Sequence, residues 1–127
     1  MKLLLDTHTF LWFIDDSSLL SAKGKALLEA DNDLLLSIGS LWEIAIKLCL
    51  GELTVAMPTD VLMTQQLTSN DIDVLAITVP HLVTVSTLPL HHRDPFDRLI
   101  IAQAMVEQLP IVSADPAFDA YPVERLW

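Results

Sequence analysis

The chain has 127 residues, of which 52% are hydrophobic, and its 17 acidic against 7 basic residues give a net charge of −10. This length suits a single domain spanning residues 1–127, while no apolar run approaches the roughly 20 residues of a membrane span, and Asp6 interrupts the apolar start too early for a signal peptide. The charge excludes a nucleic-acid surface of the usual basic kind, unless bound cations invert it or the partner is a basic protein. We expect a cytoplasmic protein, in which the single Cys49 forms no intrachain disulfide.

Short apolar segments alternate with helical patterns along the chain. Ser40 followed by Glu43 is a capping-box pattern that predicts a helix start, and Asp94 followed by Pro95 predicts another. The predicted strands cover residues 2–5, 34–36, 74–77, 111–113 and 123–127, and the predicted helices cover residues 7–14, 21–30, 40–50, 58–69, 80–87 and 94–108. This alternation predicts an α/β fold, with helices on both faces of a parallel sheet.

Four acidic residues are predicted to meet at one edge of that sheet, where parallel α/β folds bind their ligands. Asp6 and Asp115 each follow a short apolar strand, and Glu43 and Asp97 lie in the first turns of helices. Each acid taken alone is equally explained as a helix cap or turn residue. Together, four carboxylates repel one another unless divalent cations such as Mg²⁺ or Mn²⁺ neutralise them. Such ions activate water for attack at phosphorus.

A zinc site is the weaker alternative. His91, His92 and Asp94 offer zinc ligands, but adjacent histidines do not readily point at one ion, and no cysteine or third histidine has a suitable spacing. No glycine-rich phosphate loop or Gly-x-Ser-x-Gly elbow is present. His81 and His91 are predicted as loop or surface residues.

Other residues near the acids have two interpretations each. Ser113 orients a ligand or is a turn hydroxyl, and His8 lies behind the metal ligands or packs against the core. Lys47 favours an ion pair, whereas for Arg93 and Arg98 ion pairing and contact with a nucleic-acid backbone both stay open. Large aromatic side chains are predicted in the core, with excess apolar surface on the first helices available as a groove for a partner's helix: Phe10, Trp12, Phe13 and Trp42.

Four segments resemble, in order and spacing, the motifs of PIN-domain proteins of the VapC toxin type. They are residues 6–12 (DTHTFLW), 40–47 (SLWEIAIK), 92–104 (HRDPFDRLIIAQA) and 115–127, which closes with Tyr121-Pro122-Val123 and Trp127. The resemblance implies a PIN-like three-layer α/β/α sandwich around a short, mainly parallel sheet of 4–5 strands. It also implies an Mg²⁺- or Mn²⁺-dependent endoribonuclease, the toxin of a type II toxin–antitoxin pair. Such a toxin forms a homodimer and is silenced by a VapB-like antitoxin.

Carried over by position, the family's acidic metal ligands fall on Asp6, Glu43, Asp97 and Asp115. Asp6 and Asp97 are the expected principal ligands for hydrolysis by metal-activated water, and Glu43 and Asp115 complete the site. Asp94, Ser113, Arg98 and His8 are candidates for a supporting or substrate-binding role, although capping suffices to explain Asp94 and relatives commonly have Thr where this chain has Ser113. Two alternatives remain: a PIN nuclease in RNA processing without an antitoxin, and a non-catalytic PIN-fold interaction module.

Overall fold

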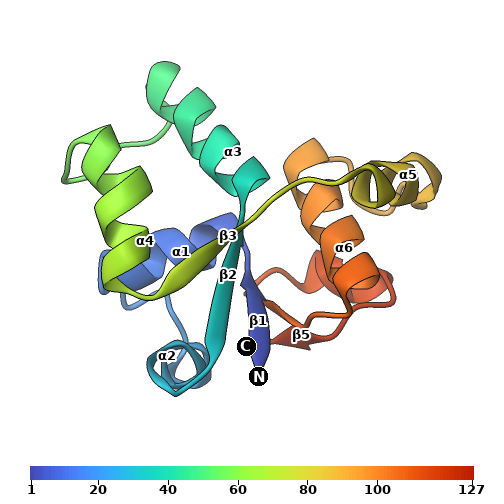
Figure 1. The fold of residues 1–127 in the computed structure, drawn as a ribbon, viewed down its shortest axis with the longest axis horizontal. Helices are drawn as coiled ribbons and strands as arrows, with labels where there is room; N and C mark the ends of the chain where they lie inside the picture. Colours follow the sequence, from blue (N-terminus) through green and yellow to red (C-terminus); the bar gives the residue numbers. More distant parts are fainter.

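The computed structural model describes residues 1–127 and is organised around a sheet of five parallel strands (Figure 1). The strands lie in the order β3-β2-β1-β4-β5, so that β1 is central and β3 and β5 form the edges. They are β1 (Lys2–Leu5), β2 (Asp33–Ser37), β3 (Ile72–Leu75), β4 (Ile111–Val112) and β5 (Arg125–Leu126). The predicted α/β class and parallel sheet are confirmed, and the sheet contains no antiparallel pair.

Helices cover both faces of the sheet. In chain order they are α1 (Thr7–Ile14), α2 (Ala22–Glu29), α3 (Ile38–Cys49), the π-helical segment η1 (Val61–Gln65), α4 (Gln66–Ser69), α5 (Val79–Thr87), α6 (Pro95–Glu107) and the short 3₁₀ segment η2 (Pro116–Ala120). Figure 1 shows α1 to α4 on one side of the sheet, with α5 and α6 together on the other. None of the helices combines the length and apolar character that crossing a membrane requires.

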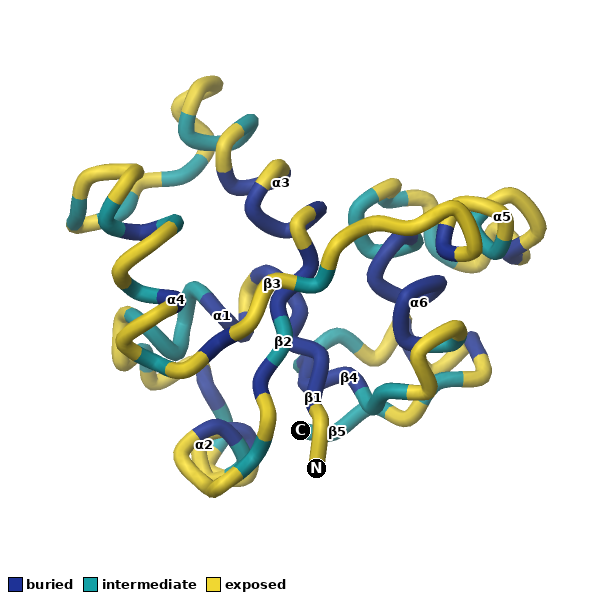
Figure 2. Tube along the Cα trace, in the orientation of Figure 1, coloured by how far each residue is buried: buried dark blue, intermediate teal, exposed yellow.

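The alternation of side chains along β1 divides the core into two layers. Leu3 and Leu5 join the cluster beneath α1 to α4, whereas Leu4 points to the opposite face and packs with Ile100 and Ile101 of α6. All three leucines are fully buried, as expected for the central strand of a covered parallel sheet (Figure 2). The molecule is therefore a three-layer α/β/α sandwich, as the resemblance implies.

Two predicted element boundaries are wrong. The third strand covers residues 72–75 instead of 74–77, because its pairing with β2 places Ile72 opposite Leu34 and leaves Val74 exposed. The third helix begins after Ser37, whose side chain accepts a hydrogen bond from the Gly39 N–H, and so the capping box predicted at residues 40–43 does not exist. Strand β2 leads directly into α3, so the last strand residue is also the helix cap.

Two predictions of burial are also wrong. Trp42, expected in the core, is 62% exposed and makes an edge-to-face contact with Phe96. His81, expected at the surface, is fully buried because it completes the start of α5: its Nδ1 accepts from the Thr78 N–H and its Nε2 contacts Glu107. Hydropathy alone does not separate a core tryptophan from an exposed one on an amphipathic helix.

Candidate metal centre

Asp6 lies where the central strand ends, and both of its carboxylate oxygens are used. Oδ1 accepts from the Thr9 N–H at 2.8 Å, capping α1, and Oδ2 accepts from the Ser113 hydroxyl at 2.5 Å. The side chain is buried, with only 6% of the residue exposed. Because β1 and β4 are adjacent, Ser113 follows β4 at the same sheet edge, and so parallel pairing brings residues 6 and 113 together.

Glu43 enters the same region from the second turn of α3. Its Oε1 accepts from the Thr7 hydroxyl at 2.7 Å, and its Oε2 pairs with the Lys47 ammonium at 2.8 Å. Glu43 is 4% exposed, and the pairing raises the pKa of the Lys47 ammonium. Since Ser37 and not Ser40 caps α3, the capping explanation for Glu43 no longer applies.

Asp97 is held in the first turn of α6, and Asp94 caps that turn as predicted. The Asp94 Oδ1 accepts from the N–H groups of Phe96 and Asp97, at 2.9 and 3.1 Å. The Asp97 carboxylate therefore remains free of the capping work. Its Oδ2 lies 3.0 Å from His92 Nε2.

Asp115 and His92 close the site on the β4 side. The Asp115 N–H donates to Ser113 Oγ, and the Asp115 Oδ1 accepts from the Ala117 N–H at the start of η2. Its Oδ2 lies 3.6 Å from His92 Nε2. His92, Asp97 and Asp115 form a group whose ligand atoms all lie within 4.8 Å of one another, a spacing that suits a metal ion.

The electrostatics of Asp97 indicate a surplus of negative charge. Burial, followed by the charges of Asp94, Glu43 and Asp6, raises the pKa of Asp97 to about 7, although His92 acts in the opposite direction. Asp6 and Glu43 thus reach Asp97 electrostatically, even though they lie outside the close group around His92. A divalent cation favours carboxylate oxygens and removes this repulsion, so the residues fit a hard cation such as Mg²⁺.

The remaining sequence candidates divide into two kinds. Ser113 is fully buried and links Asp6 to Asp115 through its hydroxyl. By contrast, His8 is exposed and its ring lies 5.7 Å from that of Trp12, outside this hydrogen-bonded network. Arg98 donates to four backbone carbonyls, those of Val85, Leu88, Pro89 and His92.

His92 is the site residue that sequence reasoning missed. Adjacent histidines rarely face one ion, so the pair at positions 91 and 92 does not by itself indicate a site residue. Only His92 faces the acids, whereas His91 is exposed and lies against Tyr121. The signal available in the sequence was the position of His92 two residues before the helix cap at the sheet edge.

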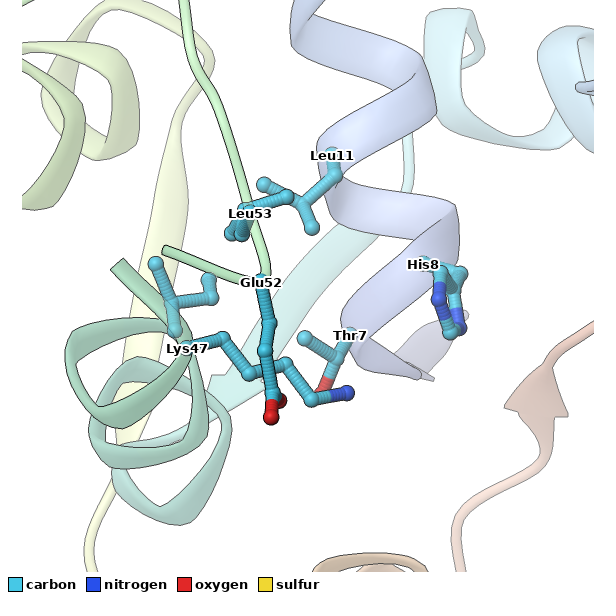
Figure 3. A pocket seen from close by; sticks show the side chains of 7 residues that line it. Thr7, His8, Leu11, Lys47, Glu52 and Leu53 are labelled. Atoms are coloured by element: carbon cyan, nitrogen blue, oxygen red, sulfur yellow. The ribbon is translucent and has the colours of Figure 1, made fainter. Parts of the chain in front are cut away.

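A pocket of about 210 Å³ is lined by Thr7 and Lys47, the two residues that bind Glu43 (Figure 3). Figure 3 shows the Lys47 side chain extending toward Thr7, with the Glu52 carboxylate beside it. A larger groove of about 410 Å³ shares His8, Leu11 and Leu53 with this pocket. The lining of this groove is mostly apolar and comes from α1 and from residues 53–57, which follow α3. Its apolar residues are Leu11, Trp12, Ile14, Leu53, Val55, Ala56 and Met57.

Comparison with known families identifies the fold. The family model described as "PIN domain" matches residues 3–124. This chain is a PIN domain. The resemblance to PIN-domain proteins is confirmed, and the acidic edge just described belongs to a PIN domain. Among curated proteins, none matches this chain.

Solved structures with the same fold include complexes named VapBC and FitAB. VapBC2 from Rickettsia felis, bound to a DNA fragment from its promoter, matches with a TM-score of 0.73 at 15% identity over 100% of both chains. VapBC-1 from nontypeable Haemophilus influenzae matches with a TM-score of 0.67 at 15% identity, covering 98% of this chain and 96% of that chain. FitAcB from Neisseria gonorrhoeae matches with a TM-score of 0.65 at 19% identity, covering 97% of this chain and 95% of that chain. This similarity is one of fold.

Proposed function

We propose that this PIN domain is an Mg²⁺- or Mn²⁺-dependent endoribonuclease that acts as the toxin of a VapBC-type pair. The observation that carries the proposal is the convergence of buried acids on Asp97, whose pKa is raised to about 7 by burial and by the neighbouring carboxylates. The buried carboxylates repel one another, so all of them can be ionised at the same time only when a cation neutralises part of their charge. Carboxylates that bind such ions are typical of phosphodiester hydrolysis.

Asp6 and Asp97 would be the principal ligands of the cation, and Asp115 and Glu43 would complete the site. When bound, such an ion activates water and stabilises the leaving oxygen at a phosphodiester. The chain itself fixes the carboxylates: Ser113 holds Asp6, Lys47 and Thr7 hold Glu43, and the Asp94 cap orients the first turn that carries Asp97. A bound cation also makes RNA acceptable to a protein with a net charge of −10.

The direct test is cleavage of RNA by the purified protein with Mg²⁺ or Mn²⁺, with and without a chelator. Asp6→Asn and Asp97→Asn are expected to lose at least about a hundredfold in rate, beyond what removing an outer partner costs. Asp31→Asn is the matched control, because Asp31 is an exposed acid at the opposite end of the sheet. Equal cleavage by the wild type and both site variants would exclude the assignment.

An antitoxin partner is supported by the apolar groove along α1. The groove is lined by Leu11, Trp12 and Met57 and shares residues with the pocket lined by Thr7 and Lys47, which both bind Glu43. An amphipathic helix fits such a groove, and a basic segment following it is attracted by the acidic edge. The solved neighbours are themselves named as VapBC and FitAB complexes. We therefore propose a VapB-like partner that covers the acidic site.

A homodimer is supported by a second apolar surface. Val79, Leu82 and Val83 of α5 are each more than half exposed, and further exposed apolar side chains lie nearby in the chain: Val74, Ile77 and Leu90. Figure 2 shows the chain from β3 to α5 as an almost continuously exposed segment. Several exposed apolar residues within one segment suit contact with a second copy.

Two other functions remain as alternatives. A PIN nuclease for RNA processing would share the site but lack the antitoxin, and a short upstream reading frame for a DNA-binding protein favours the toxin over it. A non-catalytic interaction module would bind no Mn²⁺ in calorimetry. We further propose that the protein acts in the cytoplasm, where RNA is available and a free Cys49 stays reduced.

A further inference from the structure

The imidazole of His92 has two chemically distinct uses beside Asp97 and Asp115. As a metal ligand it would offer a bare Nε2 to the ion, and the group would be a mixed nitrogen and oxygen site suited to zinc or similar ions. As a proton donor it would carry hydrogen on Nε2 and steady the two carboxylates. The distances of 3.0 and 3.6 Å from Nε2 to the carboxylate oxygens fit either use.

The contact of the other ring nitrogen, Nδ1, distinguishes the metal ligand from the proton donor. The Asp94 N–H donates to His92 Nδ1 at 3.2 Å. A backbone N–H can only donate, so Nδ1 must be the unprotonated acceptor. In a neutral imidazole the hydrogen then sits on Nε2, the nitrogen that lies beside Asp97 and Asp115. Nitrogen ligation through Nε2 would require a proton on Nδ1, directed at the Asp94 N–H.

Hydrogen bonds hold the backbone around His92 in place, and they therefore also hold the ring in the orientation that sets this tautomer. The His92 N–H donates to the Tyr121 hydroxyl at 2.8 Å, and that hydroxyl donates to the Pro89 carbonyl at 2.7 Å. The His92 carbonyl accepts from Arg98, and Asp94 is locked as the cap of α6. The ring therefore cannot exchange its two nitrogens without breaking the contact with Asp94.

We propose that His92 is a positioning residue and not a metal ligand: it keeps its Nε2 proton and holds Asp97 and Asp115 close together for a cation bound by oxygen atoms alone. The inference rests on the proposed function, and it adds that the Asp–Asp–His group, which resembles a zinc site, offers the cation oxygen ligands only, as Mg²⁺ and Mn²⁺ favour. When no cation is present, the Nε2 proton offsets part of the repulsion between the two carboxylates.

The first experiment reads the tautomer by ¹⁵N NMR of the imidazole side chains in uniformly labelled full-length protein, without metal and with Mg²⁺. The His92→Gln spectrum identifies the signals of His92. We expect the proton on Nε2 in both states. A proton on Nδ1, or its transfer there on adding Mg²⁺, would overturn the inference whatever the enzyme activity.

The second experiment measures Mn²⁺ binding by calorimetry and electron spin-echo spectroscopy. His92→Ala is expected to weaken Mn²⁺ binding about tenfold, and His92→Gln, which keeps a neutral donor, to recover most of it. His91→Ala is the matched control and should bind as the wild type does. The Mn²⁺ spectrum should contain no directly bound ¹⁴N, and such a signal that disappears in His92→Gln would establish ligation instead. Absence of Mn²⁺ binding by the wild type would overturn the metal-dependent function. The NMR experiment would still show independently whether the His92 proton lies on Nε2.

Discussion

At the scale of single residues, the acids of this PIN domain combine local capping with a role at the site. Asp6 caps α1 through one oxygen and accepts from Ser113 through the other, and Asp115 caps η2 while its second oxygen faces His92. For Asp6 and Asp115, capping and site formation therefore coexist in the same side chain. The reason is that a carboxylate has two oxygens, and a helix start needs only one.

The raised pKa of Asp97 predicts how the stability of the metal-free protein depends on pH. Burial and the neighbouring acids raise this pKa from 3.8 to about 7, so the folded state holds a proton that the unfolded state has released. The free energy of unfolding should therefore fall as the pH rises from about 4 to about 7 and level off above that.

Urea unfolding at about pH 5 and about pH 8 measures this slope. Asp97→Asn should reduce the slope and should be more stable than the wild type at the higher pH, by on the order of 2 kcal/mol. Mg²⁺ should raise the free energy of unfolding of the wild type at the higher pH, since the ion binds the folded state only. A wild type whose stability rises with pH over this range would contradict the prediction.

Ser113 makes a separate prediction, because one hydroxyl serves two acids. Ser113→Ala removes the donor to Asp6 and the acceptor for the Asp115 N–H, and should weaken Mn²⁺ binding about tenfold in calorimetry. Ser113→Thr keeps the hydroxyl and should lose less. Equal affinities for all three proteins would show that the hydroxyl does not organise the site.

At the scale of elements, Arg98 ties α6 to the end of α5. Its guanidinium donates to the carbonyls of Val85 and Leu88 at 3.2 and 3.1 Å, and to those of Pro89 and His92 at 2.9 and 3.2 Å. The four carbonyls belong to the last turn of α5 and to the loop that leads from it through His92. The planar fork of an arginine suits this arrangement, whereas a lysine ammonium offers a single centre.

Arg98→Lys should therefore lower the free energy of unfolding by about 2 kcal/mol, even though the charge is kept. Arg93→Lys is the matched control, since Arg93 is exposed, and it should change stability by less than about 0.5 kcal/mol. Urea unfolding of the three proteins measures both effects. An Arg98→Lys protein as stable as the control would mean that these carbonyl contacts contribute little.

At the scale of the whole molecule, the exposed apolar residues of α5 predict self-association. Val79, Leu82 and Val83 share one face of the helix, and all three are more than half exposed. Sedimentation equilibrium should find a dimer for the wild type and a monomer for Leu82→Glu. Leu19→Glu, which places a charge on an equally exposed leucine elsewhere, should remain dimeric. A monomeric wild type, or dissociation by both variants alike, would contradict a contact at this face.

Much of this architecture could be predicted from local pattern. The apolar run at residues 3–5 predicts a buried central strand, and Asp94-Pro95 predicts the start of α6, because burial and capping depend on neighbours in the chain. The convergence of Asp6 with the residues after β4 also followed, since parallel strands end at one edge. The third strand was misplaced by two residues, because its register depends on pairing with β2.

The α/β class, the acidic sheet edge and the similarity to PIN domains could all be predicted from the sequence, because alternating strands, helix caps and four spaced motifs depend on residues close together in the chain. Three features become visible only in the folded chain: His92 and not His91 faces the acids, Arg98 binds backbone carbonyls, and Trp42 lies at the surface. These facts depend on which groups meet across elements distant in the chain. Hydrophobicity and residue spacing do not predict such contacts, because the contacts arise from packing and from the pairing of hydrogen-bonding groups in three dimensions.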